Sequence, residues 1–353
     1  MTQASEILFE RRGTAGLVTL NRPQALNAVT LGMVRAFTRQ LHQWADDPAI
    51  TRVVVTAAGG RAFSAGGDIR ALYELGRAGR HAEMLPFWRE EYALNALIKR
   101  YRKPYVALID GIVMGGGVGV SVHGSHRVAG DRFLFAMPEV GIGFFPDVGA
   151  TFFLPRLPGA LGTYLALTGE RLGAADGLAA GIATHRVASA RLGELVAALC
   201  GDAPVDAVLA AYHEPAGEAP LQAHRTAIDR LLQGDSVEAI LAALDTAGGR
   251  GGREAGFAAA TAATICTKSP TSLKIALAQM QAGKDLTFNA CMQTEYRIVS
   301  RIIHGHDFYE GVRAVIVDKD NAPRWRPATL AEVTPAEVAR YFAPLGADEL
   351  VLP

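Results

Sequence analysis

The sequence predicts an α/β fold of repeated ββα-like units, followed by a helical C-terminal region. Three observations predict it. Short β-branched runs such as Arg52–Thr56 and Tyr105–Ile109 have the composition of buried parallel strands. Segments with apolar residues at helical spacing lie between such runs. After about residue 188 the chain becomes alanine-rich and mostly helical in pattern. Strands that alternate with helices are typical of a parallel sheet covered by helices.

The N-terminal segment predicts two strands and a helix. Glu6–Glu10 and Leu17–Leu20 have strand character and are joined by a turn around Gly13, and Asn21-Arg22-Pro23 ends the pattern. Leu31–Ala45 is predicted to be a helix because its apolar residues recur every three or four positions. These apolar residues are Met33, Val34, Phe37, Leu41 and Trp44.

The middle of the chain continues the alternation. Glu83–Lys99 is predicted to be an amphipathic helix that ends before Pro104, because proline disfavours helical backbone in the residue before it. Further strands are expected at His126–Ala129 and Phe133–Phe135. No sequence identity is visible between the units, so they are not a strict repeat.

The C-terminal part is predicted to be helical. Gly248–Gly252 is expected to be a loop. Ser269 and Pro270 then open a helix through Gln281, since serine is a good N-cap and proline suits the first turn. A second long helix is expected from 286 to 303. We place the division between an α/β core, 1–195, and a helical region, 196–353.

Composition excludes several classes of protein. The 353 residues carry 35 basic and 35 acidic side chains, so nucleic acid is not an expected partner. The N-terminus lacks a basic segment followed by an apolar stretch, and no run approaches the ~20 apolar residues that span a bilayer. Three cysteines without a CxxC pair predict neither disulfides nor a zinc site. We therefore expect a cytoplasmic protein with no membrane partner.

Two glycine-rich segments, Phe63–Ile69 and Gly111–Gly119, each follow a predicted strand. A turn from a strand into a helix exposes unpaired N–H groups, and two such turns could direct two donors at one oxygen. That would be an oxyanion hole for a thioester carbonyl. Each segment could equally be a tight turn without a ligand. The dinucleotide pattern GxGxxG and the serine-hydrolase pattern GxSxG both fail here.

A third segment, Met137–Asp147, places the acids Glu139 and Asp147 in an apolar stretch. A carboxyl group in apolar surroundings tends to have a raised pKa and can serve as an acid or a base. Both could instead be surface residues. Glu90 and Glu91 could likewise form a solvated face of the 83–99 helix. His123 and His126 lack a third ligand at a recognisable spacing, so a metal site is not predicted.

Together these motifs resemble the crotonase (enoyl-CoA hydratase/isomerase) superfamily, and several runs resemble its 3-hydroxyisobutyryl-CoA hydrolases. The superfamily motifs are Asn21-Arg22-Pro23, Leu26-Asn27-Ala28, Phe63–Ile69, Gly111–Gly119 and Pro138-Glu139. The hydrolase-like runs are Lys103–Ile109, Met114–His123, Phe135–Glu139, Phe145–Gly149, Ser269–Ile275 and His306–Asp320.

The resemblance implies a spiral of ββα units with a helical C-terminal region that covers the acyl pocket. It implies oxyanion-hole amides at Gly67 and Gly116, and substrate-contacting acids at Glu91, Glu139 and Asp147. The backbone that holds CoA would be that of Ala25, Leu26, Ala65 and Ile69. The adjoining Asp68, Gly115 and Pro138 are included among the predicted substrate-binding residues.

One departure from the superfamily pattern bears on the reaction. Its hydratases use two glutamates, and the position of the first is Gly119 here. A thioesterase acting on a short β-hydroxyacyl-CoA is therefore predicted, in which Glu139 activates water or attacks the carbonyl. The alternatives are an enoyl-CoA hydratase or isomerase and a non-catalytic acyl-CoA-binding protein. We expect no metal or redox cofactor, and a homo-oligomer, a trimer or hexamer, as in the superfamily.

Overall fold

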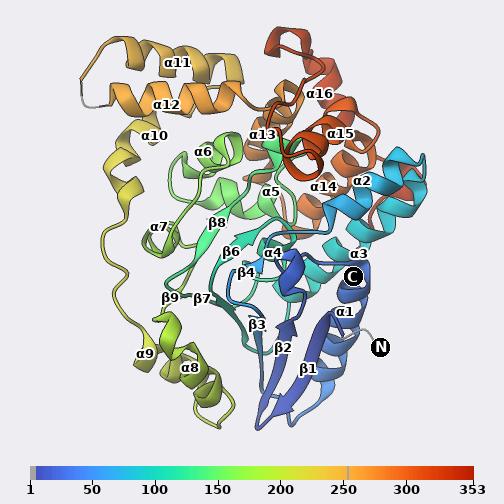
Figure 1. Ribbon diagram of the computed structural model, residues 1–353, viewed down its shortest axis with the longest axis vertical. Helices are drawn as coiled ribbons and strands as arrows, with labels where there is room; N and C mark the ends of the chain where they lie inside the picture. Colours follow the sequence, from blue (N-terminus) through green and yellow to red (C-terminus); the bar gives the residue numbers. More distant parts are fainter. Residues whose placement is uncertain (1–4, 253) are drawn as a thin grey trace. The chain divides into compact units, whose positions relative to one another are not determined.

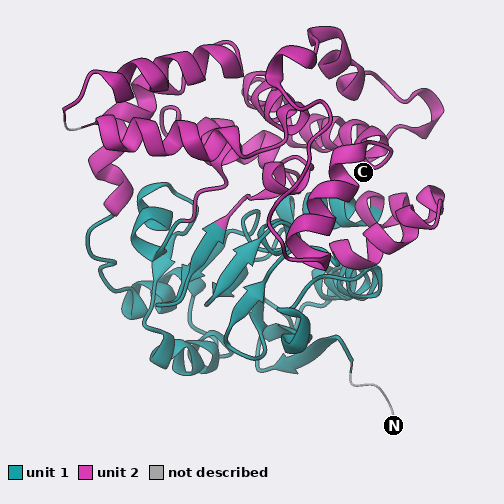
Figure 2. Ribbon diagram, turned by 45° about the horizontal axis from the view of Figure 1, so that its top comes forward, with its two compact units in different colours: residues 1–68, 90–135, 172–219 teal, residues 69–89, 136–171, 220–353 magenta. Residues whose placement is uncertain are grey.

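The structure, a computed structural model, describes residues 5–252 and 254–353. It contains two compact units, each assembled from three segments of the chain (Figure 2). Unit 1 consists of residues 1–68, 90–135 and 172–219, and unit 2 of residues 69–89, 136–171 and 220–353. Unit 1 thus continues past the division predicted after residue 195. The predicted role of residues 196–353, to cover the acyl pocket, stays a prediction.

Unit 1 contains a six-stranded sheet with the order β1-β2-β3-β5-β7-β9 (Figure 1). β1 and β2 are antiparallel, and the remaining neighbours are parallel, as the buried β-branched runs predict. A second sheet has the order β4-β6-β8. The strands are β1 (Ile7–Arg12), β2 (Ala15–Leu20), β3 (Arg52–Ala57), β4 (Ala62–Ser64), β5 (Tyr105–Ile109), β6 (Ile112–Met114), β7 (His126–Ala129), β8 (Leu134–Ala136) and β9 (His185–Arg186).

Helices cover both faces of the larger sheet. Neighbouring residues of a strand point to opposite sides, so strands that are apolar throughout need cover on both faces. Val54 and Val106 pack in one cluster with Leu195 and Leu199 of α8 (Leu192–Leu199) and with residues of α9 (Val205–Tyr212). Tyr105 points to the other side, where its ring stacks on Phe37 of α1 (Leu31–Asp46). The predicted helix after residue 30 is confirmed, and the Thr30 side chain caps it.

Unit 1 also contains α4 (Gly116–Gly119), α7 (Ala174–Ala179) and the later part of α3 (His81–Lys99). Unit 2 is helical apart from its share of β8. Its helices, besides the first part of α3, are α2 (Ile69–Arg77), α5 (Ala150–Phe153), α6 (Leu161–Thr168), α10 (Arg225–Leu231), α11 (Val237–Gly249), α12 (Ala255–Cys266), α13 (Pro270–Gly283), α14 (Phe288–Ile302), α15 (His306–Val312) and α16 (Pro335–Phe342).

The predicted helices of the C-terminal part are confirmed with small changes at their ends. α13 begins after the Ser269 cap and continues two residues beyond Gln281. The loop predicted at Gly248–Gly252 begins later than expected, because α11 includes Gly248 and Gly249. A glycine inside a helix costs only ~1 kcal/mol, which the packing of α11 beside α12 can offset (Figure 1).

None of the helices in residues 5–252 and 254–353 combines the length and apolar character needed to cross a bilayer.

Candidate active site

The turn before α1 is organised by the buried side chain of Asn27. Its amide group donates to the carbonyl oxygens of Ala58 and Ala62, both at 2.9 Å. Its oxygen accepts from the Arg22 N–H at 2.8 Å. Leu26 and Asn27 have φ angles of 50° and 55°, which residues with a side chain rarely adopt. The three hydrogen bonds therefore stabilise one conformation of a turn that is predicted to bind CoA.

The two glycine-rich turns are neighbours in unit 1, where the parallel strands β4 and β6 lead into them. A parallel bridge joins Gly67 to Val29, and its hydrogen bonds are made by the Gly66 carbonyl and the Asp68 N–H. In such a bridge the middle residue directs its own N–H away from the partner strand. The Gly67 N–H therefore points toward the other side of the turn.

Gly116 is the first residue of α4, so its N–H has no acceptor within the helix. A Cβ atom on Gly116 would lie 3.1 Å from the Gly67 nitrogen. The preceding Gly115 has φ 44° and ψ −125°, a combination that glycine tolerates best. The two predicted oxyanion-hole residues are thus adjacent, and at Gly115 and Gly116 a side chain would strain the backbone or displace its neighbours.

Glu91 belongs to the part of α3 that lies in unit 1, and only 2% of its surface is exposed. Its Oε1 atom lies 2.5 Å from the position that a Cβ on Gly116 would occupy. The preceding Glu90 instead pairs with Arg35 at 2.7 Å in a partly exposed bridge. The two acids, which only the family resemblance distinguishes in the sequence, therefore have different environments, and Glu91 is the one beside the two glycine turns.

The residues predicted to hold CoA lie along the same turns. The Ala65 N–H donates to the Leu26 carbonyl at 3.0 Å, which connects two of the motifs. The Asp68 carboxylate pairs with Arg22 at 3.0 Å, so it supports the turn through an ion pair. Ile69 begins α2 in unit 2. Seven of the predicted substrate-binding residues are partly exposed: Ala25, Leu26, Ala65, Asp68, Ile69, Gly115 and Pro138.

In unit 2, Glu139 begins the short 3-10 helix Glu139–Ile142 directly after Pro138. It is 6% exposed, and its Oε2 atom is buried without a hydrogen-bond partner among the described residues. Burial raises the pKa of Glu139 well above its usual value, and the negative charges of Asp147 and Glu295 raise it further. Asp147 is also buried. A carboxyl group whose pKa is raised by its environment is suited to proton transfer.

Glu295 on α14 is a third buried carboxyl group, which the sequence reasoning missed. Its oxygens accept hydrogen bonds from the backbone N–H groups of Gly149 at 2.8 Å and Thr151 at 2.9 Å. Burial raises the pKa of Glu295 to about 8, and the charge of Asp147 contributes, while these hydrogen bonds act in the opposite direction. The three acids therefore influence one another within unit 2.

A sequence signal for Glu295 does exist. Glu295 is one of the buried residues of α14. Most of the others are apolar and recur at helical spacing, and the full set is Cys291, Met292, Thr294, Glu295, Tyr296, Ile298, Val299 and Ile302. Acids are almost never fully buried unless they are paired, and an unneeded carboxylate on this face would be costly. An acid on the apolar face of an amphipathic helix is thus a candidate functional residue.

His123, His126 and the three cysteines have ordinary environments within the described residues. His126 pairs with Asp206 at 2.8 Å, and His123 is buried. The three cysteines are free thiols. Within the described part of the chain, no group of three or more His, Cys, Asp or Glu side chains is arranged to hold a metal ion.

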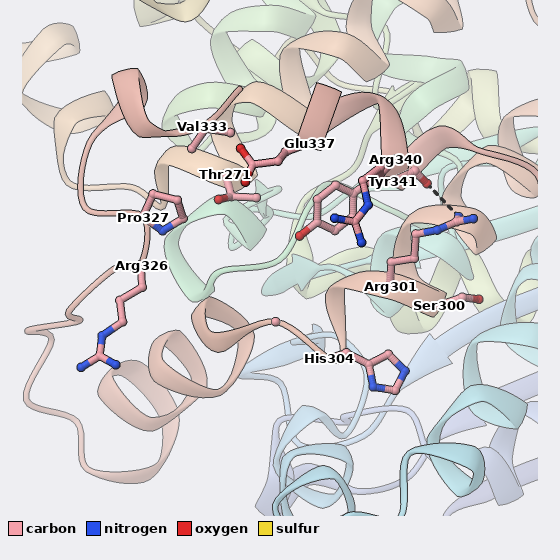
Figure 3. A pocket seen from close by; sticks show the side chains of 11 residues that line it. Thr271, Ser300, Arg301, His304, Arg326, Pro327, Val333, Glu337, Arg340 and Tyr341 are labelled. Atoms are coloured by element: carbon pink, nitrogen blue, oxygen red, sulfur yellow. Dashed lines mark hydrogen bonds between the residues drawn. The ribbon is translucent and has the colours of Figure 1, made fainter. Parts of the chain in front are cut away.

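A pocket of about 420 Å³ lies in unit 2 between α13, α14 and α16 (Figure 3). Basic and hydroxyl side chains line it, including Arg301, Arg340 and Tyr341. Arg301 donates to the Tyr341 carbonyl at 3.2 Å, so part of this charge supports the fold. None of the predicted site residues lines the pocket.

Comparisons with known proteins agree with these motifs. A family described as enoyl-CoA hydratase/isomerase matches residues 15–342. The 3-hydroxyisobutyryl-CoA hydrolase, mitochondrial, of Danio rerio is 48% identical and aligns with 99% of this chain and 92% of that protein. The human protein of the same name is 45% identical, over 98% of this chain and 91% of that protein.

Solved structures show the same similarity. A carnitinyl-CoA dehydratase from Mycobacterium thermoresistibile has a TM-score of 0.91 at 44% identity, with 98% of both chains covered. An enoyl-CoA hydratase from Rhodobacter sphaeroides has a TM-score of 0.90 at 40% identity, covering 99% of this chain and 100% of that one. The predicted fold is confirmed, and the chain belongs to the crotonase (enoyl-CoA hydratase/isomerase) superfamily and, within it, to the 3-hydroxyisobutyryl-CoA hydrolase subfamily.

Proposed function

We propose that this chain is a thioesterase that hydrolyses 3-hydroxyisobutyryl-CoA to the free hydroxy acid and CoA. Relatives with that name are 44% to 48% identical to nearly the whole chain, which supports the substrate. The observation that carries the reaction type lies on α4, whose residues 116–119 are Gly, Gly, Val and Gly. This helix offers no acid to pair with Glu139, and two acids are what hydration in this superfamily uses.

In the proposed reaction, the N–H groups of Gly67 and Gly116 bind the thioester oxygen. They stabilise the negative charge that develops there when a nucleophile adds to the carbonyl carbon, a contribution of about 3 kcal/mol for each donor. Glu91, beside Gly116, borders the acyl group. The C–S bond then breaks, and the CoA sulfur leaves and takes up a proton.

Glu139 has two possible parts in this scheme. As a general base it removes a proton from the attacking water, and as a nucleophile it forms an anhydride that water then opens. Both routes need the ionised carboxylate. Asp147 accepts a hydrogen bond from the substrate's β-hydroxyl or orients the water. Neither route uses a metal or a redox cofactor.

The test is steady-state release of free thiol from 3-hydroxyisobutyryl-CoA. Glu139→Gln and Gly116→Pro should each lower turnover by about 10²-fold or more. Gly193→Ala is a matched control, because a Cβ there meets nothing within 4 Å, and it should behave like the wild type. Turnover near the wild-type value in either site variant would refute the assignment.

The similar structures of a carnitinyl-CoA dehydratase and an enoyl-CoA hydratase favour a second candidate, an enoyl-CoA hydratase. Crotonyl-CoA separates the two reactions. Loss of the enoyl absorbance without thiol release would favour the hydratase, and thiol release from the hydroxyacyl substrate alone favours the thioesterase. Tight binding of both esters without any turnover would favour the non-catalytic acyl-CoA-binding protein.

The compartment and the assembly remain proposals. The curated relatives are named as mitochondrial, so they give the predicted cytoplasmic location no support. We propose a homo-oligomer, a trimer or hexamer as in the superfamily, which light scattering of the purified protein would test.

A further inference from the structure

The segment 146–151 contains an unusual backbone conformation directly after Asp147. Val148 has a φ angle of 52°, and Gly149 has one of 91°. A β-branched residue at positive φ is a true outlier, because its side chain collides with the backbone. Such a conformation is unfavourable and persists only where surrounding contacts hold it.

Two helices of unit 2 supply those contacts. Glu295 of α14 accepts from the N–H groups of Gly149 and Thr151, at 2.8 and 2.9 Å. Gln279 of α13 donates to the Pro146 carbonyl at 2.9 Å and to the Thr151 hydroxyl at 2.8 Å. Both side chains have 0% exposure. Glu295 and Gln279, the loop anchors, thus hold the backbone on both sides of Asp147.

A carboxyl group is a costly choice for one of these anchors. Glu295 occupies the apolar face of α14, and it lies close enough to Asp147 for the two acids to affect each other's ionisation. Desolvation and this repulsion both oppose its placement there. Each of its two oxygens accepts from one N–H group, whereas a glutamine in the same position would place an NH2 group, which only donates, against one of these N–H groups. The arrangement therefore serves the geometry around Asp147 at some expense in stability.

We propose that Glu295 is a positioning residue that makes the enzyme selective for β-hydroxyacyl thioesters. It holds the 146–151 segment in the strained conformation in which Asp147 accepts a hydrogen bond from the β-hydroxyl of the substrate. This inference rests on the proposed thioesterase function and specifies how that site recognises its substrate class. A buried site that hydrogen-bonds a substrate hydroxyl discriminates strongly against an analogue that lacks it.

The experiment compares kcat/KM for 3-hydroxyisobutyryl-CoA and for isobutyryl-CoA, which lacks only the hydroxyl group. The selectivity is the ratio of the two values. Glu295→Gln should lower this ratio at least about tenfold, mainly through the hydroxylated substrate, because the amide group of glutamine would oppose one backbone N–H. Asp147→Asn should lower the ratio as well, and the double variant should be no less selective than Asp147→Asn alone.

Gln279→Met is a second variant, which removes the other anchor's donors at similar volume and keeps the test valid if Glu295→Gln folds poorly. It too should lower the selectivity. Glu349→Gln is the control, because Glu349 pairs at 3.0 Å with Arg297, also on α14, whereas the loop anchors are Glu295 and Gln279. Its selectivity should equal that of the wild type.

The outcomes separate the inference from the function on which it rests. If the folded anchor variants lose activity equally on both substrates, Glu295 supports the fold only and the inference is wrong. Additive losses in the double variant would also overturn it. A wild-type protein that releases thiol from neither ester, or does not prefer the hydroxylated one, contradicts the proposed function itself.

Discussion

Replacing Gly116 with alanine tests the oxyanion hole with a single methyl group. The added Cβ would lie 2.5 Å from Glu91 Oε1 and 3.1 Å from the Gly67 nitrogen, whereas ordinary contacts begin at 3.4 Å. The oxygen must therefore move by about 0.9 Å, or the turn must shift by a similar amount. Glu91 is buried, and the atom of Gly67 that the methyl group approaches is the backbone nitrogen. Either movement therefore disturbs the predicted site.

The expected effect on activity follows from the loss of one amide donor. Such a loss typically costs about 3 kcal/mol in the transition state, which corresponds to a fall in kcat of about 10²-fold. The overpacking should also lower the free energy of unfolding by about 1–3 kcal/mol. Thiol release measures kcat, and urea denaturation measures the stability of the same preparation.

Gly193→Ala separates catalysis from a general effect of the methyl group. Gly193 lies on α8, where a Cβ would meet nothing within 4 Å. This variant should keep wild-type kcat and equal or higher stability, since alanine favours helix. The reasoning is refuted if folded Gly116→Ala retains a kcat within about threefold of the wild type.

Three further predictions follow from single side chains. Because the pKa of Glu139 is raised and both routes need its carboxylate, kcat/KM should still increase with pH above the range in which an ordinary glutamate titrates, and Glu139→Gln should lose this dependence in a pH–rate profile. Glu295 has its pKa raised from 4.5 to about 8, so the folded state retains a proton that the unfolded chain releases. The wild type should therefore lose stability as pH rises between those values, and urea titrations should show a smaller loss in Glu295→Gln; an equal loss in both would contradict the assignment. Asn27→Ala leaves three backbone groups without their partner and should cost about 1–3 kcal/mol or more, seen as a lower Tm, while Asn21→Ala, which removes a single hydrogen bond to the Ser5 carbonyl at the surface, should have little effect.

Local sequence patterns predicted most of the secondary structure. The valines of β3 and the apolar run of β5 are buried as their β-branched composition indicates. The helix of residues 31–46 begins after Thr30 because a cap and an amphipathic pattern coincide there. One difference is the start of the glycine loop, where α11 continues to Gly249 because its packing beside α12 outweighs the weak helical preference of glycine.

The candidate site was predictable only in part, and its prediction came from motifs rather than from local structural preferences. Gly67, Gly116 and Glu139 belong to motifs whose residue types and order carry the resemblance to the superfamily. Glu90 and Glu91 are consecutive acids on one helix, and nothing in their local pattern says which one is buried. The answer depends on what packs against each side of α3, which is a property of contacts between distant segments.

By itself the sequence determined the α/β class, the two glycine turns and the acids of the 137–147 segment, because these follow from short-range preferences and from motifs. Only the tertiary structure decided that Glu91 lies beside Gly116 and that Glu295 holds the backbone around Asp147. In each pair the two residues belong to different segments of the chain. The physical reason is that burying a carboxyl group is costly. Whether that cost is met depends on donors supplied by other elements, which a local sequence pattern does not specify.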